Sequence, residues 1–141
     1  MKRILVGVDG SIESRAAAEF AADLARKSNA QLTLAYVLPV PVPLAPDGYL
    51  QSLAAWELAE REYGMNLLRE LATRLQGPGL AVETVSPSGP AAETLADLAK
   101  TGNVDLVVVG HRGRGAVSRL LLGSVADRLV QICSKPVLVV R

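Results

Sequence analysis

Hydrophobic residues gather in five short runs along the chain, separated by longer segments with helical spacing. The runs within residues 3–8, 105–110 and 136–140 are nearly continuous in Val, Leu and Ile. Such runs are typical of strands buried on both faces of a parallel sheet, and the run at 31–37 is interpreted in the same way. The run at 80–86 alternates in polarity, which predicts a strand nearer an edge of the sheet.

Two helices are predicted in the first half of the chain. The first has one apolar face, formed by Ala17, Phe20, Ala21 and Leu24, with Ser11 or Ser14 as its N-cap. The second covers residues 50–76, and its clearest stripe consists of Leu67, Leu68, Leu71 and Leu75. Gly64 lies in the middle of this helix and allows a bend or a split, and the Gly-Pro-Gly at 77–79 ends it.

Two further helices complete a regular alternation with the strands. One opens at Gly89-Pro90, with Pro90 at the first helical position, and closes at Gly102. The last runs from about Ser124 to Cys133, and its apolar face consists of Val125, Leu129, Ile132 and Cys133. The alternation predicts one α/β domain over residues 1–141, with a parallel sheet between two layers of helices.

Residues 37–49 do not fit a regular element. Four prolines occur between Pro39 and Pro46, which predicts a loop at the end of the second strand. This loop covers a ligand, packs on a partner subunit or is a stiff surface connector, and the sequence leaves these three roles open.

Composition narrows the class of protein. Half of the 141 residues are hydrophobic, 21% are charged and the formal net charge is +1, which is ordinary for a soluble domain and gives no indication of nucleic-acid binding. The single cysteine, Cys133, excludes an internal disulfide and suits a reducing compartment. No apolar run reaches the roughly 18 residues of a membrane span, and the N-terminus enters a strand rather than a signal peptide. We therefore expect a cytoplasmic protein with no membrane contact.

The segment 110–124, GHRGRGAVSRLLLGS, carries the clearest chemistry. Gly110, Gly113 and Gly123 follow a buried strand, and Ser124 begins a helix. Glycines let backbone N–H groups surround an anion, and a helix N-terminus adds donors and positive potential. The first strand ends at Asp9, which faces this segment if the two strands are neighbours. The sequence therefore predicts a phosphate site at the carboxyl ends of the strands.

Two common phosphate motifs are absent. The chain contains neither GK[ST], which a P-loop requires, nor GxGxxG after its first strand. The loop reads GHRGRG, with the two glycine spacings of the dinucleotide fingerprint reversed.

These motifs resemble those of the universal stress protein family. The ATP-binding branch of that family carries G-x2-G-x9-G followed by Ser or Thr, and residues 110–124 match it without an insertion. The opening ILVGVDGS, the alternation of strands and helices, the segment LLGSVADRLV and the closing KPVLVV extend the resemblance over nearly the whole chain. It implies a Rossmann-like (adenine nucleotide alpha hydrolase-like) sheet of five parallel strands in the order 3-2-1-4-5, a homodimer, and ATP at the carboxyl edge.

The resemblance also implies roles for residues near the base and the ribose. Asp9 corresponds to an acidic residue near the ribose and phosphates, where it reaches a nucleotide-bound divalent ion, Mg²⁺ or Mn²⁺. Val37 corresponds to the position whose backbone binds the adenine edge. The backbone of Gly110 and Gly113 lines the ribose and phosphates.

The resemblance assigns the binding of the distal phosphates to the start of the last helix. By the same resemblance Gly123, Ser124 and the N–H of Val125 hold them. The branch often has a hydroxyl residue directly after the first glycine, and His111 stands there in this chain.

Each candidate also has a purely structural explanation. Gly110 and Gly113 can serve a tight turn, Ser124 can be an N-cap, and Asp9 can accept a hydrogen bond from the N–H of Ser11. The basic side chains either screen phosphate or are solvated surface charges, and these are Arg112, Arg114 and Arg119.

The predicted function is a dimeric, regulatory ATP-binding protein of the universal stress type. Asp9 has no evident acid–base partner, which favours at most slow ATP hydrolysis. Residues 136–140 form an apolar edge strand that a second copy can pair with. Nucleotide occupancy would alter residues 110–124 and thereby a surface seen by partners. A nucleotide-free dimeric interaction module and an enzyme acting on adenine nucleotides are the alternatives.

Overall fold

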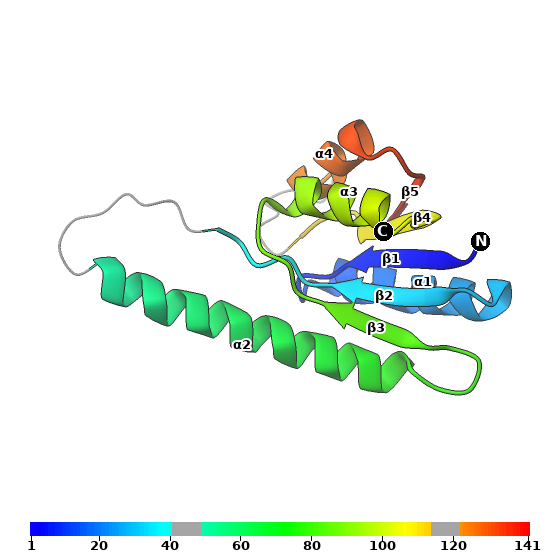
Figure 1. Cartoon of the computed structure of the whole chain (residues 1–141), viewed down its shortest axis with the longest axis horizontal. Helices are drawn as coiled ribbons and strands as arrows, with labels where there is room; N and C mark the ends of the chain where they lie inside the picture. Colours follow the sequence, from blue (N-terminus) through cyan, green and yellow to red (C-terminus); the bar gives the residue numbers. More distant parts are fainter. Residues whose placement is uncertain (41–48, 114–121) are drawn as a thin grey trace.

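A computed structural model describes residues 1–40, 49–113 and 122–141. In this described part of the chain, five strands form one parallel sheet in the order β3-β2-β1-β4-β5, as predicted (Figure 1). The strands are β1 (Arg3–Gly7), β2 (Gln31–Ala35), β3 (Val82–Val85), β4 (Leu106–Gly110) and β5 (Val137–Val140). The weakest of the predicted runs, that at 80–86, is the edge strand β3.

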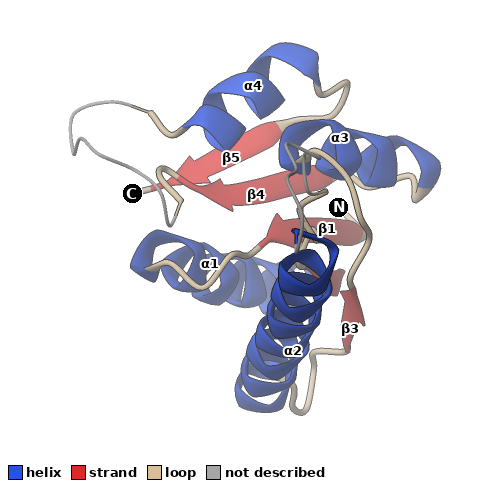
Figure 2. Cartoon of the chain, turned by 90° about the vertical axis from the view of Figure 1, so that its left-hand side faces the viewer, coloured by secondary structure: helices blue, strands red, loops and turns tan. Residues whose placement is uncertain are grey.

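Among the described residues, four helices are present, and they cover the two faces of the sheet (Figure 2). They are α1 (Ile12–Ser28), α2 (Tyr49–Leu75), α3 (Ala91–Thr101) and α4 (Ser124–Ile132). One hydrophobic cluster joins α1 and α2 to the sheet, and a second joins α3 and α4 to the opposite face. In β1, Ile4 and Val6 belong to the first cluster and Leu5 to the second, and all three are almost fully buried. The three-layer prediction is confirmed.

The buried face of α1 consists mainly of alanine. Ala17, Ala18, Ala21, Ala22 and Ala25 are completely buried, so the helix lies close to the centre of the sheet. The prediction that Phe20 belongs to this face is wrong, because its side chain is 49% exposed. A large ring does not fit between a helix and a sheet that small side chains hold close together.

The helix α2 is uninterrupted, so the split that Gly64 allowed does not occur. The four predicted leucines are buried against the sheet. Gly64 has a packing role: a Cβ there would lie 2.6 Å from Cε1 of Tyr36, a side chain that is only 2% exposed. The hydroxyl of Tyr36 donates to Glu60 (2.7 Å), and its ring contacts that of Tyr63. The glycine therefore gives the Tyr36 ring its space beneath α2.

We expect Gly64→Ala to destabilise the protein by about 1 kcal/mol. Helix propensity alone favours alanine by roughly 1 kcal/mol. Forcing a methyl group against a buried ring costs about 1–3 kcal/mol, and the contacts of Tyr36 prevent an easy retreat. Urea denaturation measures the balance. Gly77→Ala is the control, because no atom lies within 4 Å of the added methyl group there. A stabilised Gly64→Ala variant would contradict the packing role.

A single carboxylate ties the start of β1 to the start of β4. Oδ2 of Asp105 accepts hydrogen bonds from the backbone N–H of Lys2 (2.7 Å) and of Arg3 (2.9 Å). These two donors lower the pKa of Asp105 below its usual value. Since the folded protein favours the ionised form, the carboxylate stabilises the fold at neutral pH, and this contribution disappears as the pH falls through the folded pKa.

Asp105→Asn should therefore lower the urea midpoint at pH 7, and the difference from wild type should shrink below about pH 4, where free aspartate becomes protonated. Urea titrations at pH 7 and pH 3 test both parts. Asp97→Asn, at an exposed position of α3, is the matched control and should leave the midpoint unchanged. A pH-independent difference for Asp105→Asn would refute the ionic contribution.

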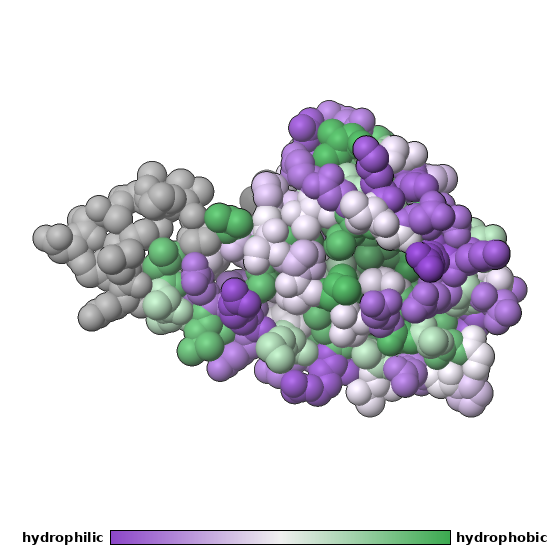
Figure 3. Space-filling view, viewed as in Figure 1, coloured by the Kyte–Doolittle hydropathy of each residue, from purple (hydrophilic) through white to green (hydrophobic). Residues whose placement is uncertain are grey.

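One face of the molecule has a hydrophobic centre. Figure 3 shows hydrophobic residues in the middle of one face, over the sheet between α3 and α2, with mainly hydrophilic residues around them. Within the described part of the chain, no helix combines the length and the apolar character needed to cross a membrane.

Candidate nucleotide site

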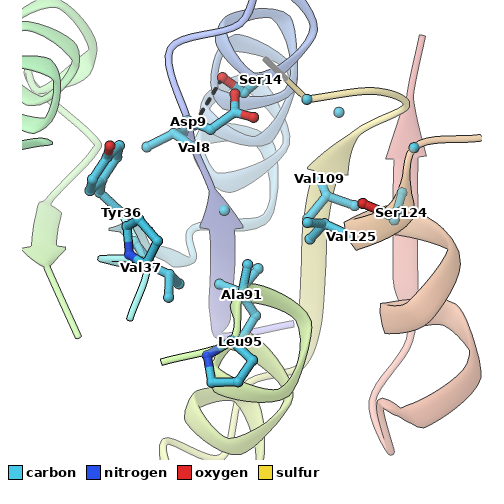
Figure 4. Close-up of a pocket in the computed structure, with 18 of the residues that line it drawn as sticks. Val8, Asp9, Ser14, Tyr36, Val37, Ala91, Leu95, Val109, Ser124 and Val125 are labelled. Atoms are coloured by element: carbon cyan, nitrogen blue, oxygen red, sulfur yellow. Dashed lines mark hydrogen bonds between the residues drawn. The ribbon is translucent and has the colours of Figure 1, made fainter. Parts of the chain in front are cut away.

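A cavity of about 840 Å³ opens at the carboxyl ends of β1, β2 and β4. Its position follows from the topology, since the order of the strands reverses between β1 and β4 and open parallel sheets bind ligands there. Figure 4 shows Tyr36 and Val37 on one side of it and Ser124 and Val125 on the other, with Asp9 at the end of β1. Its volume lies within the roughly 300–1,000 Å³ of small-molecule pockets.

The structure brings all seven predicted residues into the lining of this one cavity. They are Asp9, Val37, Gly110, Gly113, Gly123, Ser124 and Val125. The first and last of them are 116 positions apart in the chain (125 − 9). Adjacent parallel strands β1 and β4 account for the meeting, because they end at the same edge of the sheet.

The turn between β1 and α1 places the carboxylate. Oδ1 of Asp9 accepts from the N–H of Ser11 (2.9 Å), and the N–H of Asp9 donates to Oγ of Ser14 (3.2 Å). Ser11 is the N-cap of α1 and its Oγ accepts from the N–H of Ser14 (3.1 Å). The turn also needs Gly10, which has φ +90° and whose Cβ would lie 2.8 Å from Cζ of Tyr63. The predicted Asp9–Ser11 hydrogen bond is therefore present, and it fixes Asp9 beside the cavity.

The three glycines of the motif allow close approaches rather than unusual backbone angles, since none has a positive φ. A Cβ on Gly113 would lie 2.6 Å from Oδ2 of Asp9. A Cβ on Gly123 would lie 3.0 Å from Cα of Arg112, and one on Gly110 would lie 2.7 Å from the carbonyl carbon of Glu13. The motif thus packs the β4 loop tightly between α1 and α4.

The helix α4 presents donors to the cavity. The helix begins at Ser124, as predicted, and its N-cap is Gly123, which excludes the alternative that Ser124 is the cap. The first intrahelical bond runs from the N–H of Asp127 to the carbonyl of Gly123 (2.9 Å). The N–H groups of Ser124, Val125 and Ala126 precede it and have no acceptor within the helix, and all three residues line the cavity. Such a helix start favours an anion.

Apolar residues line another part of the cavity, and sequence reasoning missed most of them. Ala91 and Leu95 of α3 lie across the opening from Asp9 (Figure 4). Pro90, predicted at the first helical position, is the N-cap of α3, so the helix begins one residue later than predicted; Gly89 before it has φ +144°. The Gly-Pro pair after the third strand was the available signal, because it brings a helix start to the same sheet edge as the phosphate motif.

The predicted last helix face is correct only in part. Leu129 is completely buried, with Ala126 beside it, whereas Val125 is 36% exposed and faces the cavity. Cys133 follows the end of α4 and is partly buried against the second hydrophobic cluster.

Of the three arginines, only Arg112 lies within the described residues. It pairs with Glu13 of α1, and Nε of Arg112 is buried without a hydrogen-bond partner among the described residues. A backbone hydrogen bond at Glu13 and the pairing with Arg112 lower the pKa of Glu13. Arg114 and Arg119 lie outside the described residues, as does most of the predicted proline-rich loop; Pro39 and Val40 at its start line the cavity.

Two further observations concern metal ligands and the loop after β4. Within residues 1–40, 49–113 and 122–141, no three His, Cys, Asp or Glu side chains form a group that could hold a metal ion. The N–H of His111 donates to the carbonyl of Val140 (2.7 Å), so the loop after β4 is joined to the end of β5. The loop after β4 is therefore in contact with the last strand.

The structure is an α/β domain with a cavity and an anion-favouring helix start at its topological switch point. The chain belongs to the universal stress protein family, whose family model matches residues 1–141. It is 32% identical over 143 residues to universal stress protein MJ0531 of Methanocaldococcus jannaschii, covering 99% of this chain and 82% of that protein. It spans about half of some longer relatives: universal stress protein Rv1996 of Mycobacterium tuberculosis is 36% identical, with 97% of this chain and 47% of that protein covered.

Solved structures give the same assignment. The universal stress protein UspA from Lactobacillus plantarum superposes with a TM-score of 0.90 at 26% identity, with 99% of this chain and 97% of that chain covered. A universal stress protein solved in complex with cAMP has a TM-score of 0.75 at 28% identity, with 99% and 97% covered.

Proposed function

We propose that the protein binds ATP in this cavity and acts as a regulatory nucleotide sensor. The observation that carries the proposal is that Asp9, the loop after β4 (residues 110–113) and the start of α4 line one cavity, part of which is apolar. The apolar part suits a purine, and the donors of Ser124 and Val125 suit phosphates. The cAMP complex of the 28% identical relative supports an adenine nucleotide.

Within this proposal the residues take distinct roles. The backbone of Val37 would contact the adenine edge, and that of Gly110 and Gly113 the ribose and phosphates. Gly123, Ser124 and Val125 would hold the distal phosphates. These roles are supported by the lining of the cavity, which includes all of these residues.

A divalent ion, Mg²⁺ or Mn²⁺, would arrive with the nucleotide. Asp9 is the carboxylate at the cavity that can reach such an ion, and oxygen ligands are what these ions prefer. The ion would neutralise phosphate charge beside the Asp9 carboxylate. This role makes ATP affinity dependent on the ion.

The proposed regulatory role rests on a contact between β5 and the loop after β4, which lines the cavity. Residues 136–140 would pair with a second copy, since β5 is an edge strand with four consecutive aliphatic residues. The hydrogen bond from the N–H of His111 to the carbonyl of Val140 links the loop after β4 to that strand. We propose a cytoplasmic homodimer with at most slow ATP hydrolysis, whose surface near this loop responds to nucleotide.

Calorimetry tests the proposal directly. ATP, AMP, cAMP and adenosine are titrated into the protein, each with Mg²⁺ and with EDTA, and sizing by light scattering gives the oligomeric state. A heat of ATP binding, with an affinity that is lower in EDTA than in Mg²⁺, supports the proposal. A dimer without heat from any nucleotide would favour an interaction module, and steady ATP turnover with a second substrate would favour an enzyme.

A further inference from the structure

The first turn of α1 is braced against the loop that follows β4. Oγ of Ser11 donates to the carbonyl of Arg112 (3.5 Å), and the Arg112 side chain pairs with Glu13. The backbone of Glu13 also packs on Gly110, where a Cβ would lie 2.7 Å from the Glu13 carbonyl carbon. Two separate segments, about 100 positions apart, thus meet through contacts that converge on Arg112.

The Glu13–Arg112 pair differs from the other ion pairs between described residues. Its side chains are 19% and 22% exposed, whereas the others join side chains that are at least 34% exposed. Salt and water screen a partly buried pair less than a surface pair. The pair is therefore the one with the greatest capacity to hold two elements in a fixed relation.

Loss of the Glu13 charge would leave Arg112 in an unfavourable position. Its Nε is buried without a hydrogen-bond partner among the described residues, so the guanidinium depends on the carboxylate for compensation. A partly buried cation without its partner moves toward water, and the backbone that carries it moves as well. That backbone is the loop next to Gly113 and Gly123.

We propose that Glu13 is a positioning residue for phosphate recognition: through Arg112 it holds residues 110–113 in the form that faces the cavity. The inference rests on the proposed nucleotide function and deepens it, because it separates phosphate binding from base binding. A preorganised loop binds without first being ordered, so its loosening weakens only the contacts made by that loop. The apolar wall from α3 would be unaffected.

Glu13→Gln should therefore weaken ATP binding about tenfold and leave adenosine binding unchanged. Calorimetry with both ligands in the full chain measures the two affinities. In an Arg112→Gln background, Glu13→Gln should cause no further loss, because the two residues act as one unit. Glu70→Gln is the matched control: it breaks the pair between Arg15 of α1 and Glu70 of α2 (2.7 Å), which joins α1 to α2 and not to the loop.

Three results would overturn the proposal: an unchanged ATP affinity, an equal loss for ATP and adenosine, or tighter ATP binding in Glu13→Gln. The last would mean that Glu13 competes with phosphate for Arg112 instead of positioning it.

A ligand-free measurement separates this inference from the proposed function. The N–H of Gly123 donates to the carbonyl of His111 (2.8 Å), so its hydrogen exchange reports the position of the loop. Exchange at Gly123 should be faster in Glu13→Gln than in Glu70→Gln, even if wild type binds no nucleotide. Equal exchange in the two variants would refute the bracing itself.

Discussion

Gly113→Val is expected to weaken ATP binding at least about a hundredfold while the protein remains folded. The new Cβ would lie 2.6 Å from Oδ2 of Asp9, so the valine takes the space between this carboxylate and the loop. Asp9 would be displaced from its place beside the cavity, and the branched side chain would block the backbone of the loop. The atom in conflict belongs to a side chain, which can move without unfolding the sheet.

Calorimetry with ATP and a thermal melt measure binding and folding separately. Gly77→Val is the matched control, since it adds the same side chain where no atom lies within 4 Å of the new Cβ. Gly113→Ala should give an intermediate loss, because the Cβ conflict is present without the branched methyl groups. ATP affinity in Gly113→Val equal to that of the control would contradict the proposed phosphate site, as would absence of heat from wild type and variant alike.

The sequence predicted the sheet well because its hydrophobic runs are nearly pure. A parallel strand buried on both faces requires apolar side chains at every position, so runs such as that of β4 have few alternative interpretations. The observed strands begin or end within two residues of the predicted ones. The strand order, in contrast, came from the family resemblance, since pairing between distant segments leaves no local pattern.

The candidate site was predictable where it depends on backbone. Glycines and a helix start leave a signature in sequence, and all seven predicted residues line the cavity. The apolar wall was not predictable, because Ala91 and Leu95 look like ordinary helix residues until topology places α3 at the same edge. The Glu13–Arg112 pair was not predictable for a similar reason. The sequence does not distinguish an exposed arginine from a partly buried one, and 99 positions separate the two partners. Gly64 shows the reverse error, in which a local propensity suggested a break where tertiary packing required a small residue.

Gly110→Val should act on a different property from Gly113→Val: it should destabilise the fold by about 3 kcal/mol. Its Cβ would lie 2.7 Å from the carbonyl carbon of Glu13 and 2.9 Å from the carbonyl oxygen, both in the backbone of α1. A helix cannot retreat as a side chain can, so α1 must shift away from the sheet that its buried alanines contact. Valine favours a strand by at most about 1 kcal/mol over glycine, which is too little to offset this.

Urea denaturation of the two variants decides whether the motif has two separable parts. We expect a large drop in midpoint for Gly110→Val and a small one for Gly113→Val. If the drops are equal, the distinction between a backbone and a side-chain conflict is wrong. Gly110→Ala resolves the cause further: most of the loss should already be present with a single methyl group, because the clash is at Cβ. A loss that appears only with valine would instead place the conflict at the branched carbons, away from the backbone of α1.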